Sequence, residues 1–368
     1  MGTLRLILAI VVLIQHIGRF PFGGDNAVVG FFVISGYLMT FVMQRAYGYT
    51  PEGFSRFWCN RALRLYPSYL LVIAFSVGLL ALIPDGFRAA FKPEMAIPAS
   101  PAQWLANLTM VYPAIIPSTV SPRMAPATWA ITCELAFYLL ISLGLSRSRR
   151  ATLAWLGLSL AYSVLTIFSG DSGALAYLAI PGGSLPFCIG ALLYHYRDEI
   201  GVRIAGRGPQ LACLALGAIT LVIAVRIAAR ILWGPSVVDA IALILTGPIM
   251  LLAIAPLAVG NWTPVPLGID KRLGDLSYPI YISHWIVGLV IAWMLDWQGE
   301  HLWQRLSLCA LTLPISMAFG LLSAATIDPQ IEHLRARIRA HGNNGRTPDT
   351  PAEAQHPGSN TDAEPFAG

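Results

Sequence analysis

Long apolar runs, each close to the length of a membrane span, recur along this chain and are separated by short polar segments. An α-helix needs about 20 predominantly apolar residues to cross the hydrocarbon core of a bilayer. The pattern therefore predicts an all-α polytopic membrane protein with about ten transmembrane helices. The predicted spans are residues 3–20, 26–44, 63–83, 127–146, 151–168, 174–194, 210–232, 236–259, 276–295 and 302–325.

Two segments depart from this pattern. Residues 84–126 are rich in proline and carry several charges, which is typical of a long extramembrane loop, with a short helix expected around residues 104–111. Residues 340–368 are rich in Gly, Pro, Asn, Thr and Ala without an apolar period, and they predict a disordered cytoplasmic tail. The transmembrane domain is therefore expected to cover residues 1–339. No internal repeat is visible, which weakens the interpretation as an inverted-repeat transporter.

Composition and charge support a membrane protein and predict its orientation. The 368 residues are 56% hydrophobic and 12% charged, with mean hydropathy +0.63, whereas soluble proteins carry about 25% charged residues. Most of the 24 lysines and arginines fall on one side if the N-terminus is cytoplasmic, so we expect both termini inside and an even number of spans. The net charge of +5 then belongs to this cytoplasmic face, and nothing indicates a nucleic-acid partner.

The ends and the cysteines add two further expectations. Polar residues, including Gln15 and Arg19, follow the first apolar run without a small-residue cleavage site, which favours a retained span over a cleaved signal peptide. The five cysteines occur singly, mostly within apolar runs and without a CxxC pair. They are typical of small core residues, so we predict neither a metal site nor a disulfide framework.

Ionisable residues inside apolar spans are costly and often functional. Arg5 and His16 share one face of the first helix, about 16 Å apart along its axis. Glu134 and His284 lie inside two other spans. Counted from the span ends, His16, Glu134 and His284 have overlapping depths, which predicts one polar cavity in the outer half of the bundle. The alternative is that a neighbouring carbonyl or hydroxyl satisfies each group separately.

Arg61 and Arg64 lie one helical turn apart on the cytoplasmic side and share one helix face. Paired guanidinium groups match phosphate geometry, so this pair is a candidate anion site, for example for coenzyme A. The competing interpretation is that both residues merely follow the positive-inside rule.

Six segments in order resemble the membrane acyltransferase-3 family of bacterial O-acyltransferases, over roughly residues 3–339. Arg5 and His16 are similar to the family's basic residue, ten-residue gap and histidine. The remaining segments are similar to FFxxSGFL, to RxxR with a following proline and aromatic residue, to WSLxxExxFY, to LGxxSYxxYLxHW and to an acidic-proline pair; they are residues 30–38, 61–69, 128–138, 273–285 and 327–329. Three positions depart from the pattern: Gly30, Ala130 and Asp328 replace the usual acidic residue, serine and glutamate.

The resemblance implies transfer of an acyl group, usually acetyl, from cytoplasmic acyl-CoA to a hydroxyl of a carbohydrate acceptor. Such acceptors include an exopolysaccharide, an O-antigen, or another free or lipid-linked cell-envelope glycan. The enzyme would lie in the cell inner membrane, use acyl-CoA (acetyl-CoA first) as co-substrate and hold no permanently bound cofactor. No SGNH-type domain follows the last span, so we expect direct transfer to the acceptor or to a separate transferase protein.

Each candidate residue then receives a role. His16 is the expected general base, with Glu134 orienting the imidazole, although a variant makes His16 a transient acyl carrier. Arg5, Arg61 and Arg64 would hold the CoA phosphates at the cytoplasmic mouth. Side chains expected to line the substrate cavity or donate to an oxyanion are Ser35, Tyr278 and His284.

Two other classes of function stay open from the sequence. In a polytopic transporter, His16, Glu134 and His284 would form a proton relay. That function explains the buried titratable groups but neither the ordered motifs nor the arginine pair. A non-enzymatic scaffold in polysaccharide export has no positive feature in its favour.

Overall fold

The computed structural model describes residues 1–326 except 22, 170–171, 235–236, 260–261, 298 and 300, together with residues 329, 331 and 334. The described part is helical and contains no strand. The α-helices are α1 (Gly2–Gly18), α2 (Gly24–Val42), α3 (Pro51–Leu82), α4 (Asp85–Phe91), α5 (Pro101–Thr109), α6 (Trp129–Ser142), α7 (Arg149–Ile167), α8 (Ser172–Tyr177), α9 (Ser184–His195), α10 (Arg197–Ile204), α11 (Gly208–Trp233), α12 (Val237–Ala258), α13 (Leu267–Met294) and α14 (Leu302–Thr326). The predicted all-α fold is confirmed for these residues. The predicted tail at 340–368 and Asp328 lie outside them.

Seven described helices are long and apolar enough to cross a membrane. They are residues Gly24–Tyr47, Pro51–Leu82, Arg149–Ile167, Gly208–Trp233, Val237–Ala258, Leu267–Met294 and Leu302–Thr326. Gly2–Gly18 and Pro126–Ser142 are apolar but shorter. The sixth predicted span is divided into α8, a 3₁₀ turn at Ile180–Gly183 and α9, because Pro181 and two glycines follow one another there.

Some boundaries differ from the predictions. The third helix begins at Pro51, well before the predicted start, because Thr50 caps it and accepts a hydrogen bond from the Gly53 N–H. Arg61 and Arg64 therefore lie within α3, more than two turns after its start. Likewise α13 begins at Leu267, nine residues before the predicted span. Both extensions are the polar first turns of long helices. A prediction based on runs of apolar residues does not include such turns.

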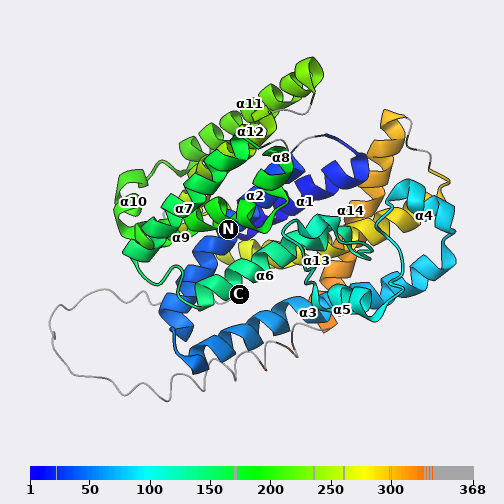
Figure 1. Cartoon of the computed structure of the whole chain (residues 1–368), viewed down its shortest axis with the longest axis horizontal. Helices are drawn as coiled ribbons and strands as arrows, with labels where there is room; N and C mark the ends of the chain where they lie inside the picture. The colour runs from blue at the N-terminus through cyan, green and yellow to red at the C-terminus, as the bar shows by residue number, and fades with distance from the viewer. Residues whose placement is uncertain are drawn as a thin grey trace.

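Helices α1, α6 and α13 lie between α11 and α12 at one edge of the molecule and α3 and α5 at the opposite edge (Figure 1). Contacts at both ends show that α1 and α13 run parallel. Asp270 accepts hydrogen bonds from the Gly2 and Thr3 N–H groups, each at 2.8 Å, and so caps α1. Near the other end of α1, the Ile17 side chain packs directly against Gly288 of α13, where a Cβ atom would collide with it.

Helices α2 and α9 approach each other closely through glycine. Gly36 lies against the Phe187 carbonyl, and Gly190 lies against the Val33 carbonyl, so neither site has space for a Cβ atom. Small residues at helix crossings allow backbones this close in membranes, where lipid competes for every apolar side chain. The crossing fixes α2, which carries Ser35 one residue before Gly36.

The predicted extramembrane segment is more structured than expected. It contains α4, which the sequence did not predict, and α5, which begins three residues before the predicted helix because Ser100 and Gln103 form a capping box. Asn107 joins α5 to the strand-like stretch after it, donating to the Pro122 carbonyl and accepting from the Met124 N–H, both at 2.9 Å. These bonds close the segment on itself, and the Tyr66 hydroxyl of α3 joins it to the helix bundle by donating to the Thr109 carbonyl at 2.7 Å.

Candidate active site

A polar cavity of about 310 Å³ lies between α1, α2, α3, α6 and α13. Each of these five helices contributes polar side chains to the wall, and α13 contributes several. The charged and hydroxyl-bearing side chains on its wall include Arg5, Ser35, Arg61, Arg64, Glu134, Tyr138, Asp270, Lys271, Asp275, Ser277, Tyr278 and Tyr281. Six of the eight residues singled out from the sequence therefore share one cavity, although they come from five separate helices.

Glu134 is held at the centre of this wall by two hydroxyl groups. Ser35 Oγ donates to Oε1 and the Tyr138 hydroxyl donates to Oε2, both at 3.0 Å. The positive charges of Arg5 and Arg61 also act on this carboxylate. A buried carboxylate with such partners can hold the arginines in place while they bind an anion.

The arginines give the cavity one strongly positive end. Arg64 and Arg5 repel each other, and Asp275 partly offsets the charge of Arg5. The Arg61 guanidinium lies 5.8 Å from the centre of the Phe57 ring. A polyanion entering between these guanidinium groups would relieve their mutual repulsion, which is the electrostatic requirement for a phosphate site.

The tyrosines of α13 are anchored by their hydroxyl groups. The Tyr278 hydroxyl donates to the Leu65 carbonyl and the Tyr281 hydroxyl donates to the Ala127 carbonyl, both at 2.9 Å. Tyr278 does line the cavity as predicted. Its proton is already engaged with the backbone of α3, so donation to an oxyanion is not what this arrangement provides.

The two histidines form a separate pair outside the wall of this cavity. His16 Nδ1 lies 3.0 Å from His284 Nε2, and the rings stack with centroids 5.2 Å apart. The ring of Trp285 packs 5.0 Å from that of His16. Tyr281 lies between the pair and the cavity, with its ring 6.2 Å from His284. The pair thus lies one helical turn of α13 beyond the cavity wall.

The hydrogen bonds of the pair define its tautomers. His284 Nδ1 lies 3.2 Å from the Ile280 carbonyl, which can only accept, so this nitrogen carries the proton. In neutral His284 the other nitrogen, Nε2, then accepts from the Nδ1–H of His16. Nε2 of neutral His16 is left with its lone pair, as in a histidine oriented to act as a base.

The expected orientation of His16 by Glu134 is wrong. His284 is the partner of His16, and Glu134 is level with Arg5 instead. The reason is the antiparallel packing of α1 and α2: Gln15 Oε1 accepts from the Gly24 N–H at 2.6 Å. From that contact, Ser35 lies about 16 Å along α2 and Arg5 about 15 Å back along α1. Ser35 binds Glu134, so the carboxylate is at the arginine end.

Residues from the extramembrane segment cover the histidine pair. The Phe91 ring packs edge-on against Trp285, with ring centroids 6.1 Å apart, and the Lys92 ammonium lies 5.4 Å from the Trp285 ring centre. The Arg19 guanidinium donates to the Phe91 carbonyl at 3.4 Å. No pattern among these residues predicted this cover.

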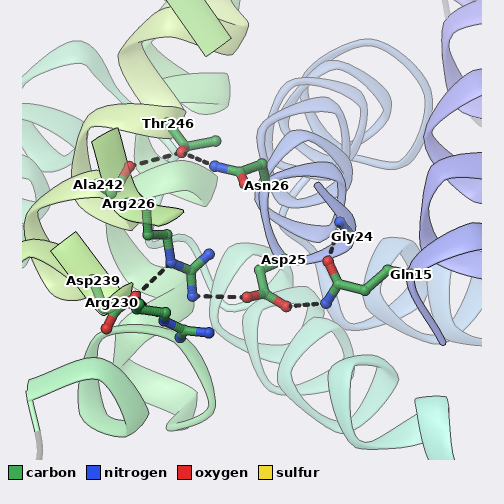
Figure 2. A network of polar contacts seen from close by, with 9 residues as sticks. All are labelled: Gln15, Gly24, Asp25, Asn26, Arg226, Arg230, Asp239, Ala242 and Thr246. Atoms are coloured by element: carbon green, nitrogen blue, oxygen red, sulfur yellow. Dashed lines mark hydrogen bonds and ion pairs between the residues drawn. The ribbon is translucent and has the colours of Figure 1, made fainter. Parts of the chain in front are cut away.

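An ion-pair network that joins the N-terminal ends of α2 and α12 to the C-terminal part of α11 was also missed. Arg226 binds Asp25 at 2.8 Å and Asp239 at 2.7 Å, and Arg230 binds Asp239 at 2.7 Å (Figure 2). Asp25 in turn accepts from Gln15, the neighbour of His16, at 2.8 Å. Arg226 is only 5% exposed although its helix is apolar. Two arginines inside a predicted span are the signal that could have found this network.

Within the described residues, no group of three His, Cys, Asp or Glu side chains is arranged to hold a metal ion. A family model described as an acyltransferase domain, that of acyltransferase family 3, matches residues 2–321. Searches among curated proteins and among solved structures found no match.

Proposed function

Because this chain belongs to the acyltransferase-3 family and is a multi-pass membrane acyltransferase, we propose that it is an acyl-CoA-dependent O-acyltransferase. The proposed acceptor is a hydroxyl of a carbohydrate in a cell-envelope glycan, and the proposed location is the inner membrane. The observation that carries the proposal is the cavity that gathers Arg5, Arg61 and Arg64 around Glu134. We retain the proposed topology of ten spans with cytoplasmic termini, which places these arginines at the cytoplasmic end.

The donor is proposed to bind with its phosphates at this end. Arg5, Arg61 and Arg64 lie on two helices and Lys271 on a third, so they would contact a polyphosphate from several sides. The pantetheine arm would extend along α1 toward His16, about 16 Å from Arg5. This arrangement separates recognition of the donor from the reaction at the thioester.

The reaction itself is proposed to use the histidine pair. The acceptor oxygen attacks the thioester carbon while its proton passes to Nε2 of His16. The C–O ester bond forms, the C–S bond breaks, and the proton on His16 is then transferred to the CoA thiolate. His284 holds the tautomer that makes Nε2 of His16 the acceptor of the proton, a role that a carboxylate has in the serine proteases.

Release of CoA thiol tests this proposal, using purified protein in lipid nanodiscs with acetyl-CoA and a panel of glycan acceptors. We expect His16→Ala to abolish acceptor-dependent release while the protein stays folded. Arg64→Ala should raise the KM for acetyl-CoA by about 10- to 100-fold, because a hydrogen bond to a charged group contributes about 1.5–3 kcal/mol. Arg149→Ala is the matched control.

Arg149 forms an exposed ion pair with Glu199 at 2.7 Å on the side assigned to the cytoplasm, lies 4.7 Å from the centre of the Tyr196 ring, and is not part of the wall of the polar cavity. An unchanged KM for acetyl-CoA in Arg64→Ala would mean that the arginine pair merely follows the positive-inside rule. Thiol release at the wild-type rate in His16→Ala would contradict the assigned base.

A further inference from the structure

A second cavity, of about 670 Å³, lies on the far side of α3 and α6 from the polar cavity. Its wall is almost entirely apolar or aromatic and comes from both helices, from residues 111–114 and from Ile180. The lining side chains that define this groove are Trp58, Ala62, Leu65, Tyr66, Leu135 and Ala136. Val111 and Leu139 lie at its edge and are 44% and 42% exposed. We call this cavity the α3–α6 groove.

The α3–α6 groove adjoins the polar cavity at one place. Arg61 and Leu65 line both cavities, so these two residues of α3 form the shared wall. Helix α6 presents Glu134 and Tyr138 to the polar cavity and the opposite face, with Leu135 and Ala136, to the groove. The two cavities therefore meet at Arg61 and Leu65, and a chain that extends from the polar cavity into the groove would have to pass these two side chains.

Polar contacts close both ends of the groove and leave its middle apolar. At one end the Trp58 Nε1–H donates to Ser142 Oγ at 3.3 Å, which joins α3 to α6. At the other end the Tyr66 hydroxyl donates to the Thr109 carbonyl at 2.7 Å, and the Tyr112 N–H donates to Thr132 at 3.3 Å. Between these ends the small side chains Ala62 and Ala136 leave the space open.

We propose that the α3–α6 groove binds the hydrocarbon chain of the acyl group, so that the enzyme accepts donors with chains much longer than acetyl. This inference rests on the proposed acyl-CoA donor. The groove offers methylene groups a wall of apolar side chains, and the polar groups of Trp58, Tyr66 and Thr132 at its ends are hydrogen-bonded. Its junction at Arg61 lies in the cavity where the donor enters, which favours the acyl chain over an unrelated bilayer lipid.

The distance to the reacting groups sets the chain length required. The Tyr278 hydroxyl contacts Leu65, and Tyr278 lies six residues before His284, or about 9 Å along α13. An acyl group whose carbonyl is near the histidine pair must therefore cross about 9 Å of the polar cavity before it reaches Leu65. Acetyl is too short to enter the groove, and a palmitoyl chain is long enough.

A native cysteine provides the test. Cys59 lines the groove and is exposed, and Cys213 on α11 is exposed elsewhere and serves as the internal control. The rate of alkylation by N-ethylmaleimide is measured for both thiols in nanodiscs with CoA, acetyl-CoA or palmitoyl-CoA. At a free concentration ten times its Kd, palmitoyl-CoA should slow alkylation of Cys59 about tenfold, because protection follows 1 + [L]/Kd. Acetyl-CoA should change neither rate.

Three results would overturn the inference. If palmitoyl-CoA leaves Cys59 unprotected, the inference is wrong. Release of CoA thiol from acetyl-CoA in the same sample then shows whether the proposed function still stands. Protection of Cys59 by lysophospholipid as strong as by palmitoyl-CoA would mean that the groove takes any membrane lipid. Protection that persists unchanged in Arg64→Ala at the same palmitoyl-CoA concentration would mean that the chain is not attached to a bound CoA.

A variant provides an independent measurement. Ala136→Trp fills the groove, so it should remove palmitoyl transfer and leave acetyl transfer within twofold of the wild type, about the precision of such rates. Leu140→Trp is the matched control, since Leu140 is on α6, is 42% exposed and lies outside the groove. Equal loss of acetyl and palmitoyl transfer in Ala136→Trp, with the control active, would contradict a groove for the chain.

Discussion

Replacing His284 with leucine tests the proposed role of the histidine pair most directly. In the wild type, Nε2 of His284 accepts the Nδ1–H of His16 at 3.0 Å and the Ile280 carbonyl fixes the tautomer of His284. Leucine is close in size but cannot accept. The buried Nδ1–H of His16 then loses its partner, at a cost of about 1–3 kcal/mol, and the tautomer with the proton on Nε2 becomes accessible. In that tautomer Nε2 of His16 already carries a proton and cannot accept the proton of the acceptor hydroxyl.

We expect the turnover number of His284→Leu to fall by about 10²- to 10⁴-fold, the usual contribution of a positioned general base. The KM for acetyl-CoA should stay unchanged, because the arginines that would bind the donor lie about 16 Å from His16 along α1. His284→Gln should recover part of the loss, since its Oε1 can accept the same hydrogen bond. Ser283→Ala, at the neighbouring position of α13, controls for a general effect on the helix.

The assay is CoA-thiol release under saturating acceptor, with folding checked by thermal unfolding of each variant. A fall in turnover of equal size in the leucine and glutamine variants would reduce His284 to a packing residue. A change in the KM for acetyl-CoA without a change in turnover would refute the reasoning, because it would place His284 at the donor site.

Two predictions concern stability rather than the reaction. Arg226→Ala should lower the free energy of unfolding in detergent by about 1.5–3 kcal/mol, because Asp239 would keep only Arg230 and the half-buried Asp25 only Gln15 as a partner; Arg226→Lys should lose less, and equal unfolding curves for wild type and Arg226→Ala would contradict the role of the network. Gly36→Ala should cost about 1–3 kcal/mol, because its Cβ would meet the backbone of α9, whereas Gly78→Ala, on an open face of α3, should be neutral or stabilising by about 0.4–1 kcal/mol. Thermal unfolding of both glycine variants side by side checks this pair.

The apolar pattern predicted the helical elements well because each long helix must present a nearly continuous apolar surface to lipid and to its neighbours. It missed the polar ends. The first turns of α3 and α13 are amphipathic. Pro51 at the start of α3 would interrupt the interior of a helix, but proline is favoured in the first turn. The additional helix α4 is short and mixed in polarity, so no periodic pattern marks it.

The predicted single cavity of His16, Glu134 and His284 is wrong, although six residues of the polar cavity were predictable because they occur in compact motifs. The partner of His16 was not, because depth had been counted from the ends of the predicted spans. That count assumes that all helices begin at the same level. Helix α6 begins at Trp129 and its Glu134 is level with Arg5, which placed the carboxylate at the wrong end of the expected site. The sequence alone does not show how deep the residues of one helix lie relative to those of another. One side-chain contact, such as that between Ser35 and Glu134, is needed to align the two helices.

The parallel packing of α1 and α13 explains how two separate sites can serve one reaction. Asp270 caps α1 and fixes its first turn against α13, while the histidine pair joins the same two helices near the other end. The distance between the arginine end and the base is therefore set by the rise of a continuous helix, about 16 Å over eleven residues. A shift of either helix by one turn would separate His16 from His284 and would also remove the cap. The proposed donor site and the proposed base would consequently move together, which favours a donor that spans a fixed distance over one that must diffuse between two mobile sites.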